Sequence, residues 1–186
     1  MSAPEETRNP FVMADPETCA TPEQVMGTCL RLELEAAALY KQFEAEAPDG
    51  ELARLWAAMA AAETHHARLV SELASRRDFV VPAVPLSMLR GVVDRVGAIR
   101  GEAETAAPLT AERMLGITAA LEFSEMDDLF TAVCRAAGVS NEAGRAEHLA
   151  PLVEAVLARQ SGDVVVRHLL AALIRLERRA GAAPAH

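Results

Sequence analysis

Four stretches of this chain repeat apolar residues at alternating intervals of three and four, the spacing of one buried face of an α-helix. They lie within residues 22–47, 51–76, 108–138 and 151–179. Aromatic residues make up only 4% of the chain, and runs of β-branched residues are rare, so strands are not favoured. With 186 residues, the chain is long enough for one domain with a sizeable core. The pattern predicts an all-α protein.

Turn and capping residues set the boundaries of these helices. Thr21 followed by Pro22 and Gln24 is a typical helix start, and the sequence Pro-Asp-Gly at 48–50 breaks the first two helices with a tight turn. A non-helical segment at 79–85 and a shorter helix at 86–104 then cross to the third helix, and Pro151 is expected in the first turn of the fourth.

This order of elements predicts a four-helix bundle with a long crossover that contains a short extra helix. The alternative is an irregular helical domain of five or six shorter helices. We expect the bundle to occupy residues 21–180, with a disordered acidic arm at 1–20 and a disordered tail at 181–186.

Each of the four apolar faces is interrupted by an acidic residue or a histidine. In the first pair of helices, Glu33 and Glu63 lie about 21 Å and about 18 Å from the shared turn, at 1.5 Å per residue. In the second pair, Glu122 lies about 24 Å from Gly138, and His168 about 25 Å from a helix start at Pro151. The spacing therefore predicts one layer of acids and histidines half-way along the bundle.

Burying such a layer is costly unless the charges are compensated. A pair of iron or manganese ions held by carboxylates and imidazoles inside a bundle compensates them. Glu63 and His66, three residues apart on one helix, are the clearest candidate pair. The simpler alternatives are that His168 is an ordinary core histidine and that Glu122 and Glu125 lie on a solvated face.

The chain resembles the ferritin-like superfamily, and its rubrerythrin branch in particular. The matching residues are Glu33 with Tyr40 seven residues later, the run Glu63-Thr64-His65-His66, Glu122 with Glu125, and His168. The resemblance implies a ferritin-like four-helix bundle that holds two iron ions, with manganese as the alternative. It implies these ligands: Glu33, Glu63, His66, Glu122, Glu125 and His168.

One position departs from the family pattern. Three residues before His168, where the family has an acid, this chain has Val165. Glu125 could keep the number of ligands at six, and otherwise the site holds one metal weakly or none. Tyr40 is the candidate catalytic residue, with a packing role as the alternative.

The resemblance implies iron oxidation and handling, or reduction of peroxide or oxygen, as in a ferroxidase or peroxidase; an oxygenase of the same superfamily is a third possibility. The alternative from a different class is a degenerate bundle with weak or no metal binding that serves as a structural or interaction module. If the chain is an enzyme, it needs an external electron donor, because it has no cysteine-rich electron-transfer module.

Charge and composition restrict the partners and the location. The net charge of −9 and the lack of a basic stripe argue against nucleic acid. We also expect no membrane partner, because no apolar run is long enough to span a bilayer. Three widely spaced cysteines and no signal-peptide pattern indicate a cytoplasmic protein with reduced thiols. We expect a homodimer or a larger homo-oligomer.

Overall fold

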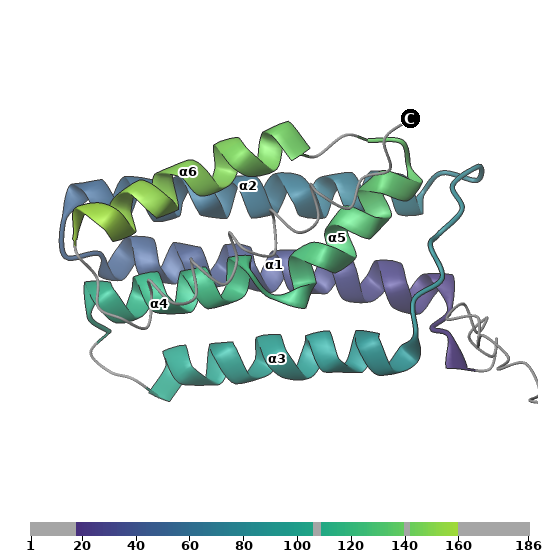
Figure 1. Cartoon of the computed structure of the whole chain (residues 1–186), viewed down its shortest axis with the longest axis horizontal. Helices are drawn as coiled ribbons and strands as arrows, with labels where there is room; N and C mark the ends of the chain where they lie inside the picture. The colour runs from purple at the N-terminus through teal and green to yellow at the C-terminus, as the bar shows by residue number, and fades with distance from the viewer. Residues whose placement is uncertain (1–17, 106–108, 140–141, 160–186) are drawn as a thin grey trace, which may run out of the picture.

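The computed structural model describes residues 18–105, 109–139 and 142–159 of the chain, and within them it is all-helical. This confirms the predicted all-α class. In Figure 1, α1 lies between α2 and α3, while α4, α5 and α6 complete the packing around a common core. The described helices are α1 (Pro22–Glu46), α2 (Gly50–Ala74), α3 (Leu86–Thr105), α4 (Ala111–Glu122), α5 (Glu125–Ala136) and α6 (Glu142–Ala158).

The first two helices form the predicted antiparallel hairpin (Figure 1). At the start of α1, the Thr21 hydroxyl accepts a hydrogen bond from the Gln24 amide, and the Gln24 side chain accepts one from the Thr21 amide. This reciprocal pair satisfies two amides that have no partner within the helix. Asp49 caps α2 by accepting hydrogen bonds from the amides of Glu51 and Leu52. The predicted bounds of both helices agree with the structure to within two residues.

The predicted crossover is also present. Residues 79–85 are non-helical, and α3 follows them within one residue of the predicted bounds. Cys19 and Ala20, at the end of the expected arm, pair with this crossover: the Ala20 amide donates to the Val84 carbonyl, and Cys19 forms an antiparallel bridge with Pro85. The rest of the expected arm and the whole expected tail lie outside the described residues.

The single third helix predicted over 108–138 is wrong, because the structure has two helices there. α4 ends at Glu122, and Ser124 caps α5 by accepting a hydrogen bond of 3.2 Å from the Met126 amide. A serine side chain that satisfies a backbone amide locally stabilises a new helix start. The predicted end is correct, since α5 stops before Gly138, which has a φ of 69°.

The predicted start of the fourth helix at Pro151 is also wrong. Pro151 lies inside α6, which begins at Glu142 and ends at Ala158. A proline within a helix removes a hydrogen bond and costs about 3 kcal/mol. Burial of Leu149 and Leu152, on either side of the exposed Pro151, offsets that cost. The six described helices show an all-α fold and do not confirm the predicted four-helix bundle with one extra helix.

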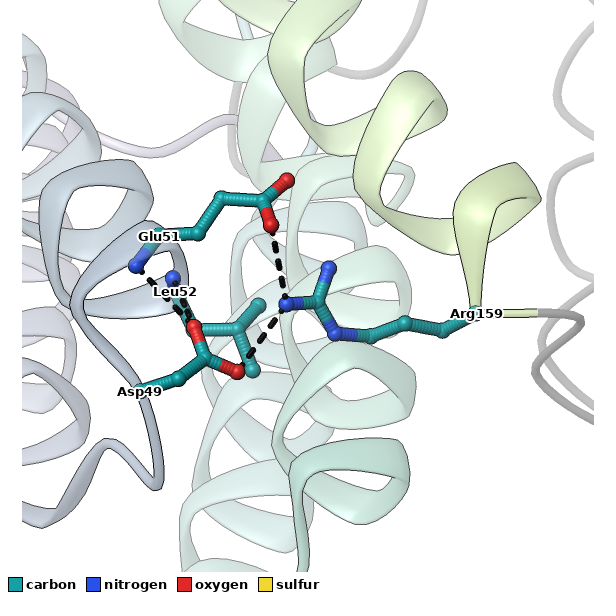
Figure 2. Close-up of polar contacts among 4 residues, drawn as sticks. All are labelled: Asp49, Glu51, Leu52 and Arg159. Carbon is teal, nitrogen blue, oxygen red and sulfur yellow. Dashed lines mark hydrogen bonds and ion pairs between the residues drawn. The ribbon is translucent and has the colours of Figure 1, made fainter.

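An ion-pair cluster joins the end of α6 to the beginning of α2 (Figure 2). Nη2 of Arg159 lies 3.1 Å from Oδ2 of Asp49 and 3.4 Å from Oε2 of Glu51. The same Asp49 carboxylate also accepts the two amide hydrogen bonds that cap α2. One side chain therefore both starts α2 and holds the end of α6 against it.

Aromatic side chains fill the core between the hairpin and α4. The rings of Phe43 and Trp56 meet edge to face, with their centroids 5.6 Å apart. The Trp56 indole donates a hydrogen bond of 3.2 Å to the Thr118 hydroxyl on α4. All three side chains are buried, so this contact satisfies two core polar groups while it fixes α4 against the hairpin.

Candidate metal centre

Three predicted ligands from the hairpin lie together in the core. One ligand atom from each of Glu33, Glu63 and His66 lies within 4.8 Å of the other two. Glu33 is 1% exposed and Glu63 is 2% exposed, whereas the His66 side chain is 20% exposed. Among the described residues, this is the only group of three or more such side chains that could hold a metal ion.

The local sequence explains why these side chains meet. The short turn between α1 and α2 fixes the register of the two helices, so Glu33 and Glu63 lie at the same height, as their distances from the turn predicted. Glu63 and His66 are three residues apart and therefore share one face of α2. Buried alanines lie one turn away on the same faces and leave room for the two helices to approach: Ala36, Ala37, Ala60 and Ala67.

The imidazole of His66 lies between the two carboxylates. Its Nδ1 is 3.1 Å from Oε2 of Glu63 and 3.5 Å from Oε2 of Glu33. Burial of the ring opposes protonation, but the hydrogen bonds and negative charges of Glu33 and Glu63 prevail and raise the pKa of His66 to about 9.

Burial affects the pKa of Glu33 in the opposite direction from that of His66, because Glu33 is an acid. Burial raises the pKa of Glu33 well above its ordinary value, and the neighbouring Glu63 carboxylate adds to this rise, although His66 opposes it. Without a metal, burial therefore favours the protonated form of Glu33 beside a protonated His66. A cation at this position stabilises the ionised carboxylates.

Phe130 of α5 covers one side of the cluster. Its ring centroid lies 4.3 Å from that of His66, with the two ring planes inclined by 31°. The inward face expected of a continuous helix over 108–138 contained Leu129 and Val133, which are buried as expected, but it did not contain Phe130. Phe130 is buried as well, and its contact with His66 depends on tertiary packing.

Glu122, a fourth predicted ligand, is buried at the end of α4. Its Oε1 accepts a hydrogen bond of 2.5 Å from the hydroxyl of Tyr40, which is fully buried. Burial, and then the negative charge of Glu122 and Glu63, raise the pKa of Tyr40 well above its ordinary value. The phenol therefore keeps its proton and remains a donor to Glu122.

The structure does not test the remaining two predicted ligands. Glu125 is the first residue of α5, but its side chain is not among those described. His168 and Val165 lie outside the described residues. The argument that placed His168 level with Glu122 counted from a helix start at Pro151, so the observed start of α6 removes its basis.

Comparison of the chain with family models, curated proteins and solved structures gives no match. Of the helices that the structure describes, none has the length and apolar character needed to cross a lipid bilayer.

Proposed function

We propose that the chain is a ferritin-like metalloprotein whose buried Glu33, Glu63 and His66 hold iron or manganese. The observation that carries the proposal is that one ligand atom from each residue lies within 4.8 Å of the other two, with both carboxylates in the core. Two adjacent acids at 1% and 2% exposure are rare in a protein core unless they are paired or bind a metal.

The donor set fits the proposed metals. Two carboxylate oxygens and one imidazole nitrogen suit divalent iron or manganese, and two ionised carboxylates balance the charge of one divalent ion. Glu122 is the candidate ligand for a second ion: it does not belong to the three-residue group, but the hydrogen bond from Tyr40 fixes its carboxyl in the core. In this proposal Glu122, Glu125 and His168 provide the remaining ligands, which the resemblance to ferritin-like proteins implies.

Bound iron would supply electron transfer to oxygen or peroxide, in iron oxidation and handling or in peroxide reduction with an external electron donor. The chain's own residues control access and position. His66 is the most exposed of the three clustered ligands, while Phe130 shields one side of its ring. Tyr40 stays protonated and fixes one oxygen of Glu122.

The second candidate function is a structural or interaction module that binds no metal. The contact of 3.1 Å between His66 and Glu63 favours it, since a protonated imidazole partly compensates the two acids. Val165, which replaces the acid found in the resembled family, favours it as well.

Metal-dependent stability distinguishes the two candidates. We expect Fe²⁺ or Mn²⁺ to stabilise the wild-type protein by about 2.7 kcal/mol at a hundredfold excess over Kd. Glu63→Ala should abolish this gain, whereas Glu72→Ala, an exposed acid on the same helix, should retain it. For each variant, the free energy of unfolding is measured with and without metal, and the difference removes the effect of the substitution itself on stability.

Metal analysis of aerobically purified protein gives the stoichiometry. Val165→Glu restores the acid that the resemblance implies and should increase both metal affinity and oxidase activity. If neither metal stabilises the wild-type protein and none co-purifies with it, the module without metal is the correct reading.

A further inference from the structure

A shallow groove with a volume of about 330 Å³ lies between α1 and α3, and its lining does not include Glu33, Glu63 or His66. Arg100 of α3 lines one side of it, and the rest is one face of α1. Leu34 in this face is 51% exposed, and it is the only exposed large hydrophobic residue among those described on α1. The α1 residues of the groove are Gly27, Leu30, Arg31, Leu34, Glu35 and Ala38.

These six residues form two parallel rows along α1, each with a spacing of four. Leu30, Leu34 and Ala38 make an apolar row, and Gly27, Arg31 and Glu35 make a second row beside it. Rows of this spacing are the ridges through which two helices most often pack. An unfilled pair of such ridges is suited to a second helix.

The two halves of the face have matching composition. Each half contains a small residue at its outer end, one leucine and one member of the opposite charges Arg31 and Glu35. A two-fold axis near Leu32 would place Arg31 against Glu35 of the partner subunit and Leu30 against Leu34 of the partner subunit. Such a contact occurs twice in a symmetric dimer, as an isologous interface requires.

The ends of the face permit close approach. A Cβ atom added at Gly27 would meet nothing within 4 Å, so the space above this residue is open. Ala38, near the other end of the face, is small and exposed, so neither end obstructs a second helix. Opposite charges that face one another also disfavour the parallel arrangement, in which like charges would meet.

Glu35 is already the centre of a charged cluster within one subunit. Its carboxylate lies 2.9 Å from Arg31 and 3.1 Å from Arg100. A second subunit therefore adds partners to charges that are already ordered, which lowers the entropic cost of association.

We propose that this face of α1 binds the same face of a second copy of the chain, as an antiparallel helix pair. The face spans about 18 Å of helix, which is small for an interface, so the dimer should be weak, with a Kd of micromolar or above. This proposal does not depend on the metal site.

Sedimentation of the full chain over a range of concentrations tests the proposed dimer. The buffer contains a chelator, so that metal does not contribute to association. The average mass should rise from 19.9 kDa toward twice that value below about 1 mM, the weak end of specific association. Leu34→Glu should abolish the rise. The matched control is Leu157→Glu, which changes a residue of α6 that is 67% exposed and outside the face, and it should leave the rise unchanged.

Charge reversal makes the test specific for the proposed pairing. Arg31→Glu and Glu35→Arg should each weaken association about tenfold or more, because like charges then meet across the interface. The double variant restores opposite charges and should restore association. A monomer at all concentrations, or equal effects of Leu34→Glu and Leu157→Glu, would overturn the proposal. Stronger association after deletion of residues 1–17 would overturn it as well, since the arm would then be the occupant of the groove.

Discussion

The hydroxyl of Tyr40 lies 2.5 Å from Oε1 of Glu122 and joins α1 to α4 through the core. Both side chains are buried, so neither exchanges this hydrogen bond for one to bulk water at low cost. The bond links the helical hairpin, which carries the cluster of Glu33, Glu63 and His66, to the second half of the chain. It therefore has a structural role whether or not a metal is bound.

Tyr40→Phe should destabilise the metal-free protein by about 1–3 kcal/mol, because it removes a buried hydrogen bond to the Glu122 carboxyl and changes the side-chain volume little. Denaturant unfolding monitored by circular dichroism measures the change. Gln42→Ala removes an exposed hydrogen bond to Glu46 on the same helix and is the control, with an expected change below about 0.5 kcal/mol. Equal stability of Tyr40→Phe and the wild-type protein would show that Glu122 has another adequate partner.

The hairpin and its cluster could be predicted because the determinants are local. Thr21 and Asp49 mark the starts of α1 and α2, and a short turn fixes the register between the helices. Counting residues from that turn therefore placed Glu33 and Glu63 at one level, and helical spacing added His66. Their burial follows from the apolar residues on the same faces.

The second half of the chain was less predictable because no short turn fixes its register to the hairpin. The apolar spacing of 115–133 continues through Ser124, and residues 117–133 contain no proline or glycine, so the pattern did not indicate the break. Pro151 was also wrongly interpreted as a helix start, because buried residues on both sides of it stabilise α6 through this proline. The contacts of Tyr40 with Glu122 and of Phe130 with His66 depend on tertiary packing, which helical periodicity does not specify.

His66 should make the stability of the metal-free protein depend on pH. Its pKa of about 9 in the folded protein exceeds the ordinary 6.5, so its protonation stabilises the fold. The contribution is fully present below pH 6.5 and is lost as the pH rises through about 9. The unfolding free energy of the wild-type protein relative to His66→Gln should fall over this range, on the order of 2 kcal/mol.

Two measurements check this dependence. Proton NMR should show the His66 ring titrating near pH 9, and unfolding curves between pH 6 and pH 10 should follow the titration. His65→Gln is the control, since the His65 side chain is exposed beside Arg68. Titration of His66 at its ordinary value would mean that the two carboxylates do not act on the ring as the distances indicate.

Ser124→Ala should destabilise the protein by about 0.5–2 kcal/mol, because it removes the side chain that caps α5. Ser124→Asp keeps an acceptor for the Met126 amide and should retain most of the stability. Thermal unfolding of the two variants side by side measures the difference. If Ser124→Ala matches the wild-type protein, the two helices are separated by tertiary packing rather than by the local hydrogen bond.

Asp49 has two separable roles, and three variants distinguish them. Asp49→Ala removes both the cap of α2 and the ion pair with Arg159, Asp49→Asn keeps an acceptor for the cap, and Glu51→Ala removes only the longer ion pair of 3.4 Å (Figure 2). Asp49→Ala should therefore lower the melting temperature most, and the other two variants only slightly, because exposed ion pairs contribute little.

The pH dependence of Asp49→Asn isolates the charge. The hydrogen bond from the Leu52 amide, followed by the contact with Arg159, holds the pKa of Asp49 below its ordinary 3.8. A lowered pKa gives stability that is present above pH 3.8 and is lost as the pH falls through the folded-state value. The difference in melting temperature between the wild-type protein and Asp49→Asn should therefore be constant near neutral pH and shrink in acid. A difference that stays constant in acid would assign the effect to the geometry of the cap rather than to the carboxylate charge.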